Sequence, residues 1–196
     1  MTEQITDVEW DQLKLSISNL IQNLHMTFGW FSEEELRETP RRILEFYKEW
    51  SNSNEFSATT FPVDIERYSH KIPSMVRAKN ISYFSMCSHH MLPFYGKVDI
   101  TYLPNKNYIG ISKLPRAVKK FASIPRMQET FSEDIADYLY ELLDPLFLYV
   151  RVKDTKHLCT MMRGVRQTEM EVDTNALRFK PEMESKLDHL KMEASL

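Results

Sequence analysis

Two short segments of the sequence place cysteine and histidine side chains close together. The first, CSHHMLPFYGK, has Cys87 and His90 three residues apart, with His89 between them. The second, HLCTMMRG, has His157 and Cys159 two residues apart. The chain contains 2 cysteines, one in each of these segments, and each lies within three residues of a histidine. This pairing predicts one metal site built from both segments, because thiolate sulfur and imidazole nitrogen are preferred ligands of zinc.

The spacing of these residues indicates a catalytic site. A tight turn would direct Cys87 and His90 at one ion, and on a strand His157 and Cys159 would point to the same face. Zinc bound by Cys87, His90 and Cys159 would keep a fourth position open, as catalytic zinc does. His89 and His157 would then lie beside the metal as proton carriers, since imidazole titrates near neutral pH. The residues alone favour a zinc-dependent hydrolase or deaminase, although the H-x-E and P-C-x-x-C deaminase signature is absent.

The composition is that of a globular protein with one main domain. The 196 residues are 42% hydrophobic and 27% charged, which allows a substantial core. The net charge of -3 disfavours general binding to nucleic acid. No apolar run approaches the roughly 20 residues of a membrane span, and the polar N-terminus lacks a signal-sequence pattern. Two cysteines do not form a disulfide framework, so we expect a protein of the reducing cytoplasm. From the net charge and the lack of an apolar span, we expect no nucleic-acid and no membrane partner.

The first part of the sequence has the pattern of helices. Capping boxes occur at Thr6–Glu9 and Ser32–Glu35, and apolar residues follow the first at helical spacing. Thr39–Pro40 resembles a further helix start, with proline in the first helical position. We therefore expect an N-terminal helical extension over residues 1–60.

Strand patterns begin in the next part of the chain. KVDITYLP alternates apolar and polar residues, and LFLYVRVK and MEVDTNALRF also have strand character. Two helical segments lie between Ser112 and Asp144. This order predicts an α+β domain over residues 61–180, with helices layered on an antiparallel sheet, and a polar helical tail over residues 181–196.

Several segments together resemble the GTP cyclohydrolase I family. The resemblance is carried, in this order, by LRETPRRILEFY, ISYFSMCSHHMLPFYGKVDITYLPNK, YIGISKLPRAVKKFA, MQETFSEDIA and KHLCTMMRGVR. The family fold is an antiparallel four-stranded sheet with two helices on one face, called the tunnelling fold, preceded by a helical extension. Family members form homo-oligomeric rings, commonly decamers, with active sites between subunits. The resemblance implies the same fold and assembly for this chain.

The resemblance also implies a reaction and a set of site residues. The reaction is hydrolytic opening of the guanine imidazole ring of GTP, with release of formate and formation of 7,8-dihydroneopterin triphosphate. By matching position, Cys87, His90 and Cys159 would hold Zn²⁺, while His89 and His157 would move protons. The residues implied in substrate binding are Glu129 on two guanine donors, Gln128 and Ser112 on the base or sugar, Lys113, Arg116 and Arg163 on the triphosphate, and Arg42 from a neighbouring subunit.

Three places depart from the family pattern. Ser88 replaces a glutamate, Thr130 replaces an arginine, and residues 167–173 are acidic where family members are rich in serine and threonine. These changes would weaken a triphosphate preference if they face the site. Alternatives are therefore a related enzyme for another guanine nucleotide or purine, a nitrile reductase of the same superfamily, and a non-catalytic purine- or pterin-binding regulator. The reductase needs a cysteine nucleophile, whereas both cysteines are explained as ligands, and a regulator would not need His89 and His157.

Overall fold

The structure, a computed structural model, describes residues 5–51, 57–64 and 74–195. The chain divides into two compact units, Met1–Ser53 and Asn54–Leu196. Small parts of the predicted segments, at residues 1–4, 65–73 and 196 among them, lie outside the described residues.

The first unit is a pair of helices, α1 (Asp7–Phe28) and α2 (Glu33–Ser51). Both predicted capping boxes are present. The Thr6 hydroxyl accepts from the Glu9 backbone N–H, and the Glu9 carboxylate accepts from the Thr6 N–H at 2.8 Å. The equivalent hydrogen bonds join Ser32 and Glu35. Ile17, Ile21 and Leu44 are buried where the two helices pack together.

The predicted helix start at Thr39–Pro40 is wrong. Pro40 lies inside α2 and is buried, so the helix continues through it. Proline in a helix interior removes one backbone hydrogen bond and strains the preceding turn. Leu36 and Leu44, on either side of Pro40, both pack in the apolar cluster with α1. Packing on both sides of the proline keeps the helix in one piece.

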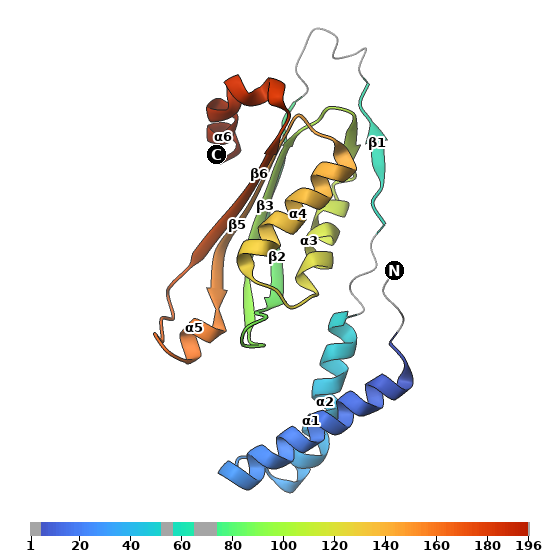
Figure 1. Ribbon diagram of the computed structural model, residues 1–196, viewed down its shortest axis with the longest axis vertical. Coiled ribbons are helices and arrows are strands. Elements are labelled where there is room, and N and C mark those ends of the chain that lie inside the picture. Colours follow the sequence, from blue (N-terminus) through green and yellow to red (C-terminus); the bar gives the residue numbers. More distant parts are fainter. Residues whose placement is uncertain (1–4, 52–56, 65–73, 196) are drawn as a thin grey trace. The chain divides into compact units, whose positions relative to one another are not determined.

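An antiparallel four-stranded sheet is the centre of the second unit, with the strand order β2-β3-β5-β6 (Figure 1). Its strands are β2 (Val76–Met86), β3 (Pro93–Leu103), β5 (Phe147–His157) and β6 (Val172–Phe179). Two short strands, β1 (Thr60–Pro62) and β4 (Asn107–Ile109), pair with each other. The predicted antiparallel sheet is confirmed.

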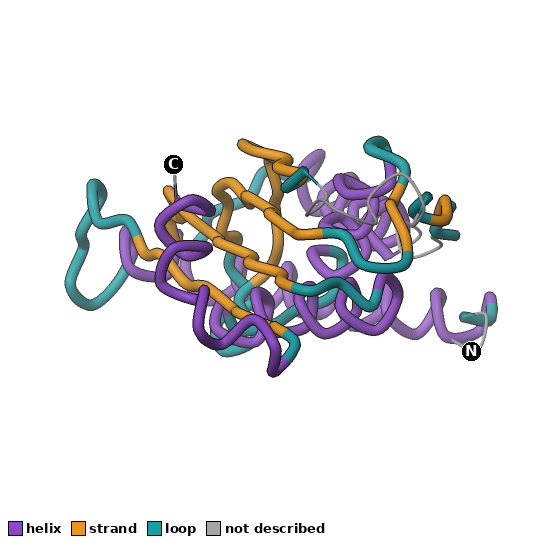
Figure 2. The backbone as a smooth tube through the Cα atoms, turned by 90° about the horizontal axis from the view of Figure 1, so that it is seen from above, coloured by secondary structure: helices purple, strands orange, loops and turns teal. Residues whose placement is uncertain are grey.

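Two helices, α3 (Lys113–Ala122) and α4 (Gln128–Leu143), cover one face of this sheet, and Figure 2 shows the same layers from above. Fully buried apolar side chains fill the space between them, including Val98, Ile100, Val150, Ile135 and Leu139. The predicted α+β fold with two helices on one face is therefore confirmed. Burial of apolar surface in this layer supplies most of the driving force for folding.

The C-terminal segment packs against the other face of the sheet. It consists of a 3₁₀ helix, Pro181–Lys186, and α6 (Leu187–Ser195). Met183 and Leu190 are buried in one cluster with Phe147, whereas Leu148 belongs to the core beneath α3 and α4. Successive strand residues point to opposite faces, which explains the division. The segment expected to be a polar helix therefore buries apolar side chains.

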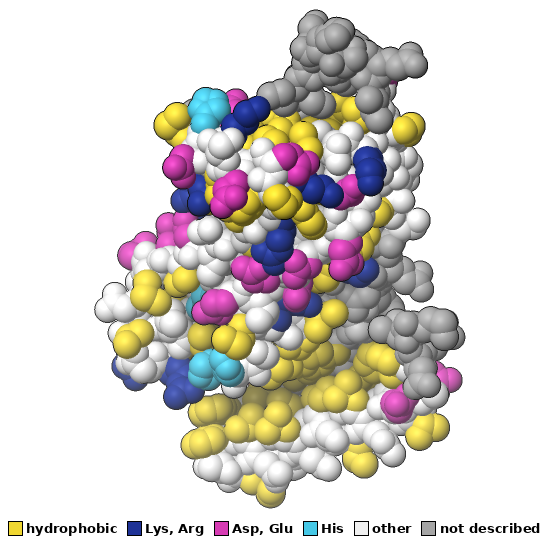
Figure 3. Space-filling model, turned by 45° about the horizontal axis from the view of Figure 1, so that its top comes forward, with side chains coloured by type: hydrophobic (Ala, Val, Ile, Leu, Met, Phe, Trp, Pro, Cys, Tyr) yellow, Lys and Arg dark blue, Asp and Glu magenta, His cyan; other side chains and the backbone are white. Residues whose placement is uncertain are grey.

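Acidic and basic side chains are interspersed on the surface seen in Figure 3. Ion pairs lie on the sheet face away from α3 and α4. Lys153 Nζ is 2.6 Å from Asp99 Oδ2, and Arg151 Nη2 is 2.6 Å from Asp173 Oδ2. None of the helices in the described part of the chain has the length and apolarity needed to cross a membrane.

Candidate metal centre

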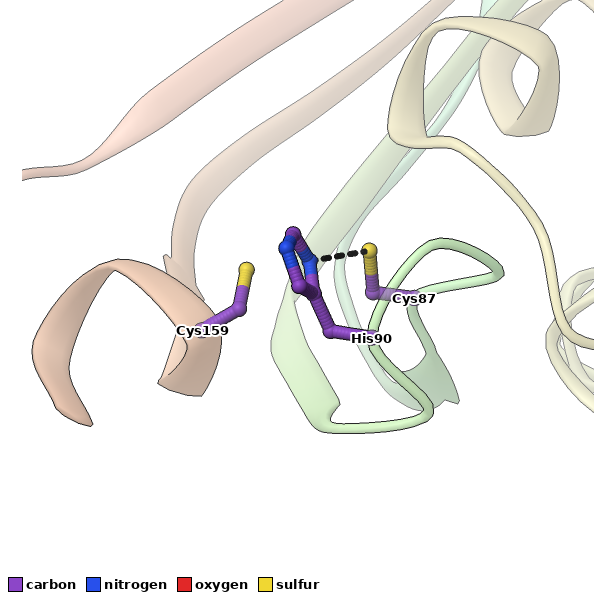
Figure 4. A group of neighbouring side chains, drawn as sticks. All are labelled: Cys87, His90 and Cys159. Carbon is purple, nitrogen blue, oxygen red and sulfur yellow. Dashed lines mark hydrogen bonds between the residues drawn. The ribbon is translucent and has the colours of Figure 1, made fainter. Parts of the chain in front are cut away.

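The structure brings Cys87, His90 and Cys159 together (Figure 4). One ligand atom from each lies within 4.8 Å of the other two. The Cys87 sulfur is 3.8 Å from His90 Nδ1. Cys87 is buried, Cys159 is partly buried and His90 is exposed, so the group lies at the surface of the unit.

A tight turn after β2 places Cys87 and His90. The Cys87 carbonyl accepts from the N–H groups of His90 and Met91, and the Cys87 N–H donates to Leu92. Met91 adopts a left-handed conformation with φ 51°, which reverses the chain within four residues. The predicted turn between Cys87 and His90 is thus present.

The prediction that His157 and Cys159 lie on one strand face is wrong. β5 ends at His157, and Cys159 is in the short helix α5 (Leu158–Met162). The Thr160 hydroxyl donates to the His157 carbonyl at 2.9 Å, which helps the chain turn there. His157 is thus placed by the strand and Cys159 by the helix, so the two side chains do not share a face. Cys159 therefore lies toward Cys87, while His157 is held by other neighbours.

The donor set fits zinc. Two sulfur atoms and one imidazole nitrogen, close enough to share one ion, form the mixed Cys/His set that Zn²⁺ prefers, with one tetrahedral position left over. The pKa of the Cys159 thiol is raised mainly by burial and, to a lesser extent, by the nearby Cys87. A dication between the two sulfur atoms would favour the thiolates instead.

His157 is fixed in position beside this group. Its ring stacks on Phe94 with centroids 4.7 Å apart and an interplanar angle of 2°. His157 Nε2 lies 2.8 Å from Gln128 Oε1, and Gln128 Nε2 donates to the Val172 carbonyl at 2.9 Å. Gln128 is 2% exposed, so both ends of its amide are occupied within the protein. Burial lowers the pKa of His157, and the nearby Glu129 opposes this effect.

Two of the predicted phosphate-binding residues, Lys113 and Arg116, lie elsewhere in the second unit, together with Ser112, which was predicted to bind the base or sugar. Ser112 and Lys113 are at the first turn of α3, and Arg116 follows one turn later. β4 lies just before this turn, and its Ile109 N–H donates to the hydroxyl of Tyr102. Tyr102 is near one end of β3, whereas Phe94 is near the other end. A strand rises about 3.3 Å per residue, so the two ends of β3 are roughly 30 Å apart. One chain therefore does not bring these residues to its own metal group.

The other predicted residues are exposed and accessible. Glu129 is in the first turn of α4, beside Gln128, and Arg163 ends α5 next to the Cys159 segment. His89 lies in the turn with His90, their ring centroids 6.1 Å apart. Arg42 is on α2, in the first unit. Exposure of these side chains leaves them free to contact a ligand or another subunit.

The departures from the family pattern are also on the surface. Ser88 is exposed, and its N–H donates to the Arg126 carbonyl at 3.2 Å. Thr130 is exposed on α4. In the acidic stretch, Glu169 and Glu171 approach Lys156. These carboxylates lie close to basic side chains of the chain itself, as expected for a solvated surface.

The sequence is similar to proteins of one known family. The sequence model of the GTP cyclohydrolase I family matches residues 17–194. Proteins named GTP cyclohydrolase 1 are similar to the chain: one from a Hydrogenobaculum species is 40% identical over 147 residues (75% of this chain, 78% of the relative). One from Aquifex aeolicus is 38% identical over 161 residues (81% and 84%), and one from Leptospira biflexa is 37% identical over 168 residues (82% and 87%). The chain therefore belongs to the GTP cyclohydrolase I family.

Proposed function

We propose that the protein opens the imidazole ring of the guanine of GTP by hydrolysis, releasing formate and forming 7,8-dihydroneopterin triphosphate. The observation that carries the proposal is the convergence of Cys87, His90 and Cys159, from segments far apart in the sequence, in a chain of this family. Retention of a fixed His157 beside the group favours an enzyme over a regulator that only binds.

Cys87, His90 and Cys159 would hold Zn²⁺, which when bound supplies Lewis-acid activation of a water nucleophile. His157, held by Gln128, would carry a proton to or from the purine ring as it is hydrated and opened. His89, exposed in the same turn as His90, would be the second proton carrier. A reducing cytoplasm would keep both free cysteines available as ligands.

Glu129 would recognise the guanine base. A carboxylate offers two acceptor oxygens, which match the adjacent ring N–H and amino donors of guanine. Its place in the first turn of α4, directly after Gln128, which contacts His157, supports this role. Gln128 would act indirectly, by orienting His157, because its amide is already occupied.

We also propose that each complete site is formed by more than one copy of the chain, within a homo-oligomeric ring. Lys113 and Arg116 would bind the triphosphate, and Ser112 the base or sugar, in a site whose metal belongs to a neighbouring copy. The positions of these residues support the proposal. Ser112, Lys113 and Arg116 are at the start of α3, whereas Cys87 of the metal group pairs with Arg126, beyond the other end of α3. Arg163, next to α5, would complete the phosphate contacts, because arginine forks match phosphate oxygens. Arg42 would come from a further copy.

The reaction is tested with zinc-loaded protein and GTP. We expect formate and a fluorescent pterin, after oxidation of the product, in equal amounts. The same assay with GDP, GMP and guanosine identifies the preferred nucleotide. A Cys159→Ser variant is the control for metal dependence. Formate release from none of these nucleotides by metal-loaded, folded protein would reject the proposal.

The shared site is tested by mixing two inactive variants. His157→Ala removes a residue at the metal end, and Lys113→Ala removes one at the phosphate end. If sites are shared between copies, co-assembly of the two variants restores part of the activity, since some sites receive both native residues. Mixing two preparations of the same variant is the matched control. No recovery in mixed rings would mean that each site is built from one chain.

A further inference from the structure

Arg126 contacts the chain on both sides of Cys87 through its backbone. Its N–H donates to the Met86 carbonyl at 2.9 Å, and its carbonyl accepts from the Ser88 N–H at 3.2 Å. Cys87 and Arg126 form an isolated β-bridge. The buried cysteine of the metal group is therefore held between two hydrogen bonds to a single residue of the segment that joins α3 to α4.

The side chain of Arg126 is anchored in the helix layer. Its guanidinium forms an ion pair with Asp134 of α4 and lies 5.6 Å from the ring centre of Phe121 and 6.0 Å from that of Phe131. The side chain is 10% exposed. Phe121 belongs to α3, and Phe131 and Asp134 belong to α4, so one arginine links both helices.

Burial of a guanidinium at this position has an energetic cost. Its Nε is buried without a hydrogen-bond partner, which is costly for a charged group. A buried ion pair is often matched or exceeded in stability by apolar side chains of similar volume. What the arginine side chain adds is a fixed position. Its ion pair with Asp134 and its contacts with two aromatic rings hold the side chain, and this in turn holds the Arg126 backbone beside Cys87.

We propose that Arg126 is a positioning residue that couples the metal ligand Cys87 to the start of α4. Gln128 and Glu129 follow Arg126 by two and three residues. The same anchor therefore also places Gln128, proposed to orient His157, and Glu129, proposed to recognise the guanine base. The inference rests on the metal role proposed for Cys87. It is tested by metal affinity, which is measured without any nucleotide.

The experiment compares zinc dissociation constants, obtained by competition with a chromophoric chelator, for the native chain and for Arg126→Ala and Arg126→Lys. Loss of residues that orient metal ligands commonly weakens binding about 10- to 100-fold, and we expect this for Arg126→Ala. Arg126→Lys keeps the charge but lacks the planar fork, so partial recovery is expected. With Co²⁺ in place of zinc, the thiolate-to-cobalt absorption of Arg126→Ala should shift, which reports a changed Cys87 geometry.

Arg178→Ala is the matched control. Arg178 also pairs with carboxylates of α4, Glu133 and Asp137, whereas the backbone hydrogen bonds on either side of Cys87 are those of Arg126. It should bind zinc as the native chain does. If Arg126→Ala does not fold, Asp134→Asn removes the anchor while leaving Arg126 in place, and weaker zinc binding is again expected.

Three results separate the possibilities. Native affinity in a folded Arg126→Ala or Asp134→Asn variant would overturn the role of Arg126 while leaving the metal site intact. Equal losses in the Arg126 and Arg178 variants would also overturn it, by showing a general effect of α4. Failure of the native chain to bind zinc or cobalt would instead reject the proposed metal site and, with it, this inference.

Discussion

Replacing Gln128 by leucine should loosen His157 without touching any metal ligand. Gln128 Nε2 donates to the Val172 carbonyl, which can only accept, so the orientation of the amide is fixed. Gln128 Oε1 then faces His157 Nε2 at 2.8 Å and must accept a hydrogen bond from its N–H. Neutral His157 is therefore protonated on Nε2 and carries its lone pair on Nδ1.

The magnitude follows from the two hydrogen bonds that Gln128→Leu removes. Each contributes about 0.5–1.5 kcal/mol net, so the free energy of unfolding should fall by about 2 kcal/mol. For a chain of this size that corresponds to a decrease of about 4–8 °C in Tm. Thr130→Ala, an exposed change in the same first turn of α4, should alter stability by less than about 0.5 kcal/mol and serves as the control.

The assay combines denaturant unfolding with long-range ¹H–¹⁵N NMR of the histidine rings, which distinguishes the two neutral tautomers. We expect the Nε2–H form of His157 in the native chain and a mixture of forms in Gln128→Leu, together with a large loss of turnover and nearly native zinc content. An Nδ1–H form in the native chain, or unchanged stability in the variant, would refute the hydrogen-bond assignment.

Three further predictions concern single side chains. Cys159→Ser should lose bound zinc while the apoprotein keeps its stability within about 0.5 kcal/mol, and metal analysis showing full zinc content would contradict a shared ligand role with Cys87. Glu129→Gln should lower kcat/KM for GTP by about tenfold to a hundredfold, because an amide donor then faces a guanine donor, and unchanged steady-state kinetics would place base recognition elsewhere. Burial raises the pKa of Tyr83, whose hydroxyl lies 2.9 Å from Thr155 Oγ1. Its stabilising contribution should be complete below about pH 10 and should fall as the pH rises further, whereas Tyr83→Phe should lack this alkaline loss in unfolding measurements.

Much of the fold follows from local sequence patterns. The capping boxes at Thr6 and Ser32 begin helices because their hydrogen bonds involve residues only three apart. The alternation in KVDITYLP correctly indicated a strand with Val98, Ile100 and Tyr102 buried on one face. Leu103 is buried as well, because the C-terminal segment packs on the other face there. Pro40 gave the opposite result: a local rule placed a helix start there, but contacts with α1, far away in the sequence, decide the backbone.

The site was predictable to the extent that it depends on residue types. Cys87, His90 and Cys159 were expected to converge, and they do. Cys159 was expected on a strand because a five-residue helix such as α5 is too short to show a helical period. A lone arginine between two helices carries no motif, so the burial of Arg126 arises only when α3 and α4 pack side by side.

The metal group has a consequence for the order of events during synthesis and folding. Cys87 and His90 leave the ribosome well before Cys159, and two ligands from one short turn bind zinc weakly. The third ligand reaches them only after β5 has paired with β3, where Phe94 lies opposite His157. Contacts between residues so distant in sequence form late. Tight zinc capture should therefore follow the pairing of β5 with β3, and a chain truncated before α5 should fail to retain the metal.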